Sequence, residues 1–486
     1  MPLSPKVYTW LCGLFASLGS IIFGYDLGVI AGVLPAPDFI RVMGDRYNNP
    51  NLQGLIASIF GAFFGMFPVA YCADKFGRRI TIQLGAAVYI LGGALQTGAT
   101  NMDLMLSGRF FAGFGVGIMS DLAPLYQAEI AHPSIRGRLT TLQQATFVAS
   151  WVTYGTSAGL KGTQAEWRIP LGLQILPALP LISFMLLLPE SPRWLAEKGR
   201  MEEARKTLAR LHAHGDVDDP FVLAQIEDMK ADIHKARDIG KSSWRELFVV
   251  PSNFRRLSLG YILQFSVQMT GVSAIQYYST TMGFTSTRIL LFQSINSIIA
   301  LIGEACCVLW IDHTGRRRPL IIGNVASGLS FVVGAILMAR YPVLTTLFFF
   351  RTWVFNFFFS ACIGPLSWAY PAEIFSTRTR AKSTAITSSS SWISNFFIAQ
   401  VTPKAFGAIG WKYLVFAICG HTNALFIWAF YPASNYITPL TQMDALFENS
   451  PLFVPGTPYS KVDDHRAAER ELRQGTPSLI PCRGVT

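Results

Sequence analysis

Asp26 is an acidic residue inside the first of several long apolar stretches of the sequence, and Arg109 lies inside the fourth. If such a stretch crosses a membrane, a charge at its centre costs at least about 2.5–3.5 kcal/mol on insertion scales, so the residue should pair, titrate or face a cavity. Arg109 is the natural partner of Asp26. The two residues predict either a carboxylate that exchanges a proton or a static buried ion pair that only fixes packing.

Other apolar stretches contain amide, hydroxyl and aromatic side chains that suit a polyhydroxylated solute. Such a solute needs hydrogen-bonding groups in place of its water, because burial of an uncompensated hydroxyl costs on the order of 1–3 kcal/mol. From residue types alone, most of these side chains would be interhelical hydrogen bonds or core aromatics. The candidates are Phe23, Gln144, Gln268, Ser273, Tyr277, Trp368, Trp392 and Asn395.

Charged motifs recur where the apolar stretches end. The segment from Asp74 to Arg79 is repeated 238 residues later, and the pair Glu129 and Arg136 is repeated 244 residues later. Topology-setting charge explains part of this set, but the acids at fixed spacing predict a cytoplasmic latch. Because an exposed ion pair contributes only about 0–1 kcal/mol, only a network can act as a latch. Its expected members are Asp74, Arg78, Arg79, Glu129, Arg136, Glu190, Arg193, Asp312, Arg316, Arg317, Glu373 and Arg380.

The stretches that hold these residues are long enough to cross a bilayer. Only 14% of the 486 residues are charged and 51% are hydrophobic, whereas soluble domains carry about 25% charged residues. A hydrocarbon core about 30 Å thick needs roughly 20 apolar residues per helix. Such runs centre on residues 10–34, 52–72, 80–98, 104–126, 139–160, 168–188, 257–283, 289–311, 319–339, 345–370, 384–402 and 411–431.

This order of runs predicts an all-α membrane protein with twelve transmembrane helices in two pseudo-symmetric halves of six. Two unrelated motifs that recur in order at nearly one offset indicate that the halves are copies. We expect an N-terminal half at 1–188, a cytoplasmic helical linker at 189–255, a C-terminal half at 256–432 and a cytoplasmic tail at 433–486. Basic blocks in alternate loops place both termini in the cytoplasm, with the plasma membrane as the expected location.

Short motifs of glycine, proline, aromatic and charged residues follow one another along the chain. They are Gly24-Tyr25-Asp26, Gly108-Arg109, Pro124-x-Tyr126-x-x-Glu129, Arg136-Gly137-Arg138, Pro189-Glu190-Ser191-Pro192-Arg193, Gln268-x-Thr270-Gly271 with Tyr277-Tyr278, and Gly364-Pro365-x-x-Trp368. In this order the motifs resemble those of the sugar porter family of the major facilitator superfamily, of the fungal type. The resemblance extends from Gly24 to about Phe447.

The resemblance implies transport of a monosaccharide or polyol by alternating access, with the polar and aromatic candidates lining a central cavity. It also implies proton symport, in which protonation of Asp26 releases Arg109. The family usually has two adjacent glutamines and an asparagine in the seventh span, where this chain has Val267, Gln268 and Ser273. These departures lie at the expected sugar site, so the resemblance does not establish a preference for hexoses. A passive uniporter and a non-transporting nutrient sensor are the alternatives.

Enzyme chemistry is not expected, because the sequence lacks a Ser-His-Asp grouping, a P-loop and a metal-ligand cluster. No cofactor and no metal are therefore predicted. Gly113, Gly115 and Gly117 have no preceding strand, so close helix packing explains them better than a nucleotide-binding loop. The expected partners of a monomeric chain are a sugar or polyol, the proton and the lipid bilayer. Nucleic acid is excluded, because the basic residues behind the net charge of +11 are clustered in short loops.

Two further charges stand in apolar stretches of the second half. Glu304 lies eight residues before Asp312, about 12 Å deep by helical rise, and either faces the cavity or has a structural partner. Arg351 lies near the outer end of the tenth stretch. We expect its side chain to extend to the membrane interface.

Overall fold

The computed structural model describes residues 4–49, 52, 60–131, 146–238, 244–278, 286–340, 345–376, 379–409, 414–432, 447 and 451–457. Within these residues the regular elements are helices, and six helical stretches are long and apolar enough to cross a membrane. They are Pro5–Val33, Arg78–Thr97, Met102–Ile130, Gln164–Leu187, Arg288–Ile311 and Arg317–Leu337. The prediction of an all-α membrane protein is confirmed.

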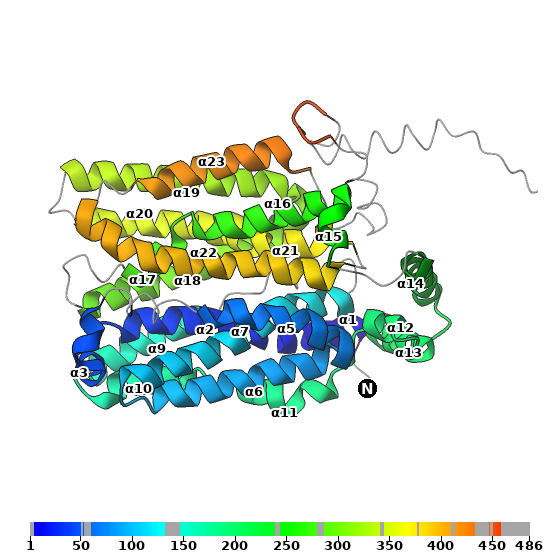
Figure 1. Ribbon diagram of the computed structural model, residues 1–486, viewed down its shortest axis with the longest axis horizontal. Coiled ribbons are helices and arrows are strands. Elements are labelled where there is room, and N and C mark those ends of the chain that lie inside the picture. The colour runs from blue at the N-terminus through cyan, green and yellow to red at the C-terminus, as the bar shows by residue number, and fades with distance from the viewer. Residues whose placement is uncertain are drawn as a thin grey trace, which may run out of the picture.

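The two halves of the chain form two helical bundles that lie side by side (Figure 1). The first bundle contains α1 (Pro5–Ala16), α2 (Leu18–Val33), α5 (Phe60–Phe76), α6 (Arg78–Thr97), α7 (Met102–Ile130), α9 (Thr146–Gly159), α10 (Gln164–Leu173) and α11 (Ala178–Phe184), with η2 (Met185–Leu187) and the short α3 (Pro37–Met43) and η1 (Gly44–Asn48). The second contains α16 (Pro251–Gln268), α17 (Val272–Tyr278), α18 (Ser286–Thr314), α19 (Arg317–Arg340), α20 (Thr345–Phe358), η4 (Phe359–Ile363), α21 (Gly364–Ile374), α22 (Arg380–Ile409) and α23 (Val415–Phe430).

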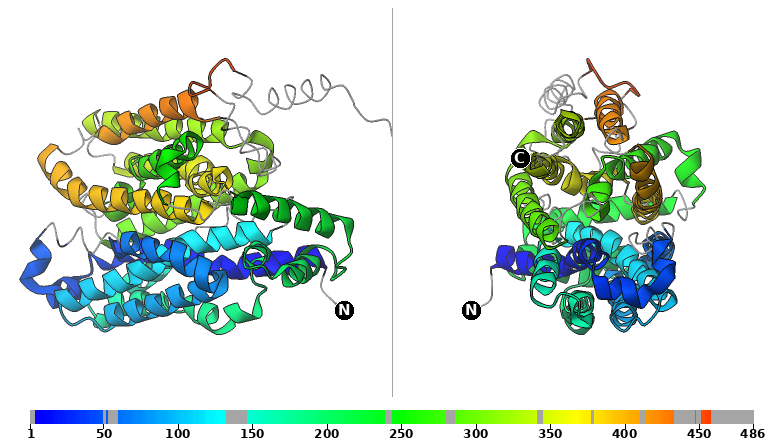
Figure 2. Two further views of the ribbon diagram at one scale, coloured as in Figure 1. Left: turned by 45° about the vertical axis from the view of Figure 1, so that its right-hand side comes forward. Right: turned by 90° about the vertical axis from the view of Figure 1, so that its left-hand side faces the viewer.

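Helices of the linker cover one end of the molecule, near the start of α1 (Figures 1 and 2). The short α15 (Glu246–Val249) precedes α16, and three longer elements form a small apolar cluster of their own. The Thr9 hydroxyl of α1 donates to the Leu211 carbonyl at 2.8 Å, which fastens this cluster to the first bundle. The three elements are α12 (Pro192–Glu197), α13 (Met201–His212) and α14 (Pro220–Asp238).

The covered end is named the arginine-rich end, after Arg78, Arg79, Arg316 and Arg317 at the starts of α6 and α19. The outer surface of the bundles is apolar instead. Leu309 of α18 is 73% exposed and Ile418 of α23 is 64% exposed. A water-soluble surface rarely presents such side chains in large numbers, whereas a lipid-facing surface requires them.

Glycines let α5, α6 and α7 pack with their backbones in contact. A Cβ added to Gly115 would lie 2.6 Å from the Gly85 carbonyl oxygen of α6, and one added to Gly117 would lie 2.4 Å from the Ala62 carbonyl oxygen of α5. Small residues that permit such close approach are typical of helix contacts in membranes. The predicted packing role is confirmed for Gly115 and Gly117.

We predict that Gly115→Ala destabilises the protein, because the new methyl group meets backbone atoms that have no room to move away. Overpacking of this kind costs about 1–3 kcal/mol. The measurement is thermal unfolding of the detergent-solubilised protein. Gly155→Ala in α9 is the control, because its Cβ would meet nothing within 4 Å. Equal melting temperatures for the two variants would contradict the packing argument.

Candidate functional site

A cavity lies between the two bundles, with about 1190 Å³ of space outside the protein atoms, part of it open to solvent. The first bundle lines it with one face of α2, where small residues alternate with larger ones, and with Ser150 of α9. The second bundle supplies most of the polar groups. The lining residues of α2 are Phe23, Gly24, Leu27, Gly28 and Ala31.

The wall from the second bundle is a connected hydrogen-bond network. Asn395 Nδ2 donates to Ser273 Oγ at 3.0 Å, and Ser273 Oγ donates to Gln268 Oε1 at 2.5 Å. Gln268 Nε2 donates to Ser391 Oγ at 3.3 Å. Gln268, Ser273 and Ser391 line the cavity, whereas Asn395 supports them from behind. The wall thus holds its amide and hydroxyl groups in fixed positions before a solute arrives.

Aromatic rings close the cavity on one side and bridge the two bundles. The Phe23 ring of α2 lies 5.8 Å from the Trp368 ring of α21 and 5.3 Å from the Trp392 ring of α22, edge to face in both cases. Phe23 and Trp368 line the cavity. Trp392 is buried beneath Phe23, and its indole N–H has no hydrogen-bond partner within the described chain.

Polar lining residues of α18 and α20 are absent from the candidates predicted from sequence. Gln293, Asn296 and Ser297 follow helical spacing on one face of α18, and Thr352 and Asn356 do so on α20. Asn356 Nδ2 donates to the Asn296 carbonyl at 3.1 Å and so joins the two helices. A search for polar residues at spacings of three and four within apolar stretches would have found them.

The described residues that line the cavity carry no charge. Asp26 belongs to the lining helix α2, but its carboxylate is paired with Arg109 of α7 instead. Arg109 Nη1 lies 3.0 Å from Oδ1 and 3.1 Å from Oδ2, and both side chains are fully buried. The predicted ion pair is therefore present, directly behind the cavity wall.

At the arginine-rich end the repeated motifs form the same ion pair twice. Arg78 binds both oxygens of Glu129 at 3.0 Å and also donates to the Ala73 carbonyl. Arg316 binds Glu373 at 3.0 and 2.7 Å in the same bidentate way and donates to the Ile311 carbonyl. Each pair lies inside one bundle, so neither of these contacts by itself joins the two halves. Asp74 of α5 does lie within electrostatic range of Lys382 of α22 in the other bundle.

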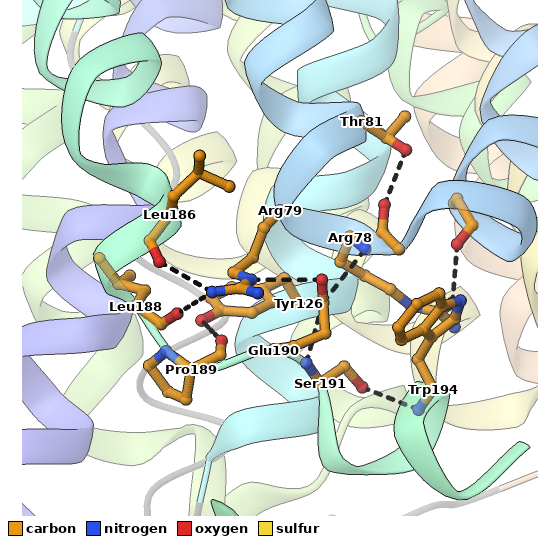
Figure 3. Close-up of polar contacts among 12 residues, drawn as sticks. Arg78, Arg79, Thr81, Tyr126, Leu186, Leu188, Pro189, Glu190, Ser191 and Trp194 are labelled. Atoms are coloured by element: carbon orange, nitrogen blue, oxygen red, sulfur yellow. Dashed lines mark hydrogen bonds and ion pairs between the residues drawn. The ribbon is translucent and has the colours of Figure 1, made fainter. Parts of the chain in front are cut away.

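Glu190 connects the first arginine motif to the linker (Figure 3). Its carboxylate accepts from the Arg78 backbone N–H at 3.2 Å and from Arg79 Nε at 3.3 Å. Gly77 adopts φ +91°, and a Cβ there would lie 2.6 Å from Glu190 Oε2. Only glycine therefore allows the loop to close around this acid.

The linker helix α12 brings further charge to the same place. Arg193 is close enough to Glu129 to interact with it electrostatically. Burial raises the pKa of the Glu197 carboxyl, while Arg78 and Arg193 act in the opposite direction. In the second motif Arg317 donates to the Trp428 carbonyl, and Arg380 donates to the Phe375 carbonyl at 3.2 Å.

Gln144 and Arg136 lie outside the described residues, as do the side chains of Tyr277 and Asp312. Their predicted roles stay predictions.

Glu304 is buried and is not one of the described lining residues of the cavity. The expectation that Arg351 extends to the membrane interface is wrong. Arg351 is only 7% exposed, and its guanidinium lies 4.6 Å above the Phe331 ring of α19. Gly334 provides the space, because a Cβ there would lie 2.1 Å from Arg351 Cδ.

Two pseudo-symmetric helical bundles around a central cavity whose described lining is uncharged define a multi-pass membrane transporter rather than an enzyme. The chain belongs to the sugar (and other) transporter family, whose model matches residues 12–447. It is 31% identical to the glucose transporter mfs1 of Aspergillus flavus, over 99% of this chain and 97% of the relative. It is also 31% identical to a quinate permease of Neurospora africana, over 92% and 90% of the two chains.

Solved structures share the fold. The proton:xylose symporter XylE bound to 6-bromo-6-deoxy-D-glucose superposes with a TM-score of 0.79 at 24% identity, covering 91% of this chain and 99% of XylE. The inward open conformation of XylE from E. coli superposes with a TM-score of 0.69 at 23% identity, covering 90% and 99%. The fold is therefore that of the major facilitator superfamily, as predicted.

We predict that Gln268→Ala weakens the apparent affinity for the transported solute, because it removes an amide and also disconnects Ser273 from Ser391. Loss of such a buried hydrogen-bonding group costs about 1–3 kcal/mol, or roughly 5- to 150-fold in affinity. The measurement is the KM for uptake in a transporter-deficient cell. Ser330→Ala in α19 is the control, because within the described structure its hydroxyl donates to the Ser327 carbonyl of the same helix. An unchanged KM in Gln268→Ala would remove this network from the binding site.

Proposed function

We propose that this protein carries an uncharged monosaccharide or polyol across the membrane by alternating access, coupled to a proton. The observation that carries the proposal is the pairing of a neutral, hydrogen-bonding cavity with one fully buried ion pair, Asp26–Arg109, directly behind its wall. The cavity supplies a solute site between two bundles that can tilt. The ion pair supplies a site whose charge a proton can change.

The wall chemistry favours a neutral solute over a sugar acid. A carboxylate in the cavity would need a cation or several N–H donors, because an unpaired buried charge is costly. The described lining supplies amides and hydroxyls from Gln268, Gln293, Asn296 and Asn356, with an aromatic face from Trp368. This set matches hydroxyl groups and a C–H face. Among the relatives, the glucose transporter is therefore a better guide to the solute than the quinate permease.

The position of Asp26 on the lining helix supports the proposal of proton coupling. Protonation removes its charge and frees Arg109 from α2, so α2 and α7 are able to shift relative to one another. A passive carrier is the second candidate, because Arg109 Nη1 contacts both carboxylate oxygens and such a pair could stay closed throughout the cycle. Nothing in this scheme needs a cofactor.

The arginine-rich end is proposed to face the cytoplasm, together with both termini and the linker, since positive charge in short loops marks that side. The plasma membrane and a monomeric state complete the proposal. The arginine motifs and Glu190 are proposed to act as a latch that stiffens each bundle where the linker is attached. Asp74 and Lys382 supply the electrostatic link between the bundles at this latch.

We predict that Asp26→Asn abolishes accumulation of the solute against its gradient but spares exchange of labelled for unlabelled solute. The neutral side chain mimics the protonated form, so the cycle runs without the proton. Uptake driven by an imposed pH gradient and counterflow in proteoliposomes measure the two activities. The control is Asp103→Asn. Asp103 lies on α7, the helix of Arg109, and its exposed side chain pairs with Arg46 of η1. Accumulation by Asp26→Asn at the wild-type level would assign the coupled proton to another site, whereas a wild type that does not accumulate the solute would be a passive carrier.

We also predict that neutral hexoses, pentoses or polyols compete for uptake more strongly than their carboxylate counterparts. A panel of glucose, xylose, inositol, glycerol and quinate, each tested against a labelled solute, distinguishes these classes. Stronger competition by quinate would contradict the argument from the uncharged wall. No competition by any member of the panel would overturn transport of sugars and polyols altogether.

A further inference from the structure

A second buried carboxylate, Asp121, lies on the interface between the two bundles and has no role in the scheme above. It belongs to α7, eight residues before Glu129, which is about 12 Å by helical rise. Its side chain contacts α22 of the other bundle and is 5% exposed as a residue. Ser388 Oγ lies 3.1 Å from Oδ1, and Thr384 Oγ1 lies 3.5 Å from Oδ2.

These contacts lie between the cavity and the arginine-rich end. Ser391 lines the cavity, and Ser388 and Thr384 follow on the same helix in the direction of Arg380. The aromatic rings of Phe23 and Trp392 are in contact across the bundles beside the same stretch of α22. Asp121 therefore joins α7 to α22 on the side of the cavity that faces the arginine-rich end.

The hydrogen bonds around Asp121 fit a neutral carboxyl group better than a carboxylate. Thr384 has one hydroxyl proton, and its nearer acceptor is the Arg380 carbonyl of its own helix at 2.9 Å. If Oδ2 carries a proton, it can donate to Thr384 Oγ1 while Thr384 still donates to Arg380 and Ser388 donates to Oδ1. If Asp121 is ionised, Ser388 is its one well-placed donor in the described structure. A buried charge so poorly compensated is expensive.

Among the residues that the structure describes, no charged group pairs with Asp121. Within the described chain its hydrogen-bond partners are the two hydroxyls, and it forms no ion pair. On α22, Arg380 donates to the Phe375 carbonyl and Lys382 lies over the Trp244 ring. Other titratable groups lie on α7 and on the elements packed against it. They are Lys6, Tyr8 and Cys12 of α1, Tyr25 and Asp26 of α2, Asp45, Arg46 and Tyr47 of η1, Tyr71, Cys72, Asp74 and Lys75 of α5, Arg78, Arg79 and Tyr89 of α6, Asp103, Arg109, Tyr126 and Glu129 of α7, Arg193 and Glu197 of α12, Tyr370 and Glu373 of α21, and Lys404 of α22.

We propose that Asp121 is a proton-dependent gate residue, whose neutral carboxyl bridges Thr384 and Ser388 and holds the cavity closed toward the arginine-rich end. When the bundles separate there, water reaches the carboxyl, which releases its proton and ionises. Closure thus binds a proton and opening releases it. The proposal rests on alternating access, but it concerns a different residue from the ion pair of Asp26.

The linkage makes a quantitative prediction. Because opening releases up to one proton, the ratio of open to closed molecules rises with pH by up to about tenfold per pH unit. The probe is a pair of spin labels on Phe76→Cys of α5 and Arg318→Cys of α19, both exposed and on different bundles at the arginine-rich end. Cys72, Cys306, Cys419 and Cys482 are replaced by alanine. Pulsed electron paramagnetic resonance on the protein in lipid nanodiscs then measures the distance between the two labels. The distance distribution gives the open fraction from about pH 5 to pH 9, without any solute.

Asp121→Asn is the decisive variant, because its amide can donate to Thr384 and accept from Ser388 as the neutral carboxyl does. It is expected to stay closed with a flat pH profile. Thr384→Val removes the acceptor of the carboxyl proton, so the midpoint of opening is expected to move to lower pH. Ser389→Ala is the matched control on α22, because the Ser389 hydroxyl bonds Ile386 of its own helix, and it should follow the wild type.

A wild-type profile that is independent of pH, or an Asp121→Asn profile that still rises with pH, would overturn the proposal. If Asp121→Asn fails to fold, an unmoved midpoint in Thr384→Val overturns it equally. A profile abolished by Asp26→Asn and kept by Asp121→Asn would assign the proton to the ion pair instead. Solute counterflow on the same preparation is the separate test of transport. Absence of counterflow in the wild type would refute the proposed function, whereas the pH profile of the open fraction would still test the gate by itself.

Discussion

A charge moved from water into a helical bundle needs a partner, and this requirement organises the structure more than any single apolar contact. Asp26 ties α2 to α7 through Arg109, and Arg78 ties α6 to α7 through Glu129. The second bundle repeats the latter pair with its own residues. Removal of one member leaves the other charge buried, which costs roughly 3–5 kcal/mol. While both of its members are charged, each of these pairs therefore holds two helices of its bundle together.

Because the strong pairs lie within the bundles, the interface between the bundles is left to weaker contacts. Hydroxyl groups supply hydrogen bonds there, as in Ser294 Oγ to the Ser150 carbonyl at 3.0 Å and in the contacts of Asp121 with α22. Aromatic rings meet edge to face across it. Each such contact contributes about 0.5–1.5 kcal/mol. Two stiff units joined by such an interface are able to tilt without losing their own structure, which is what alternating access requires.

The described cavity wall avoids buried charge in the same way, because its polar groups are neutral. The wall from the second bundle is a chain of neutral donors and acceptors from Asn395 through Ser273 and Gln268 to Ser391. Ser273, where the resemblance to the sugar porters leads us to expect an asparagine, is held by Gln268 itself. A different residue at this position would rearrange the neighbouring donors and acceptors, because each group in such a network is held by the next.

The sequence by itself determined the membrane class, the duplicated halves and the ion pair of Asp26, because long apolar runs indicate membrane spans, a buried acid needs a buried base as its partner, and repeated motifs reveal copies. The tertiary structure decided what one helix alone leaves open, namely which face of each helix meets the other bundle. It placed the polar faces of α18 and α20 on the cavity, buried Arg351 against Phe331 and set Asp121 opposite Thr384 and Ser388. Those outcomes depend on how helices far apart in the chain rotate and pack, and the period of a single helix carries no information about its partner.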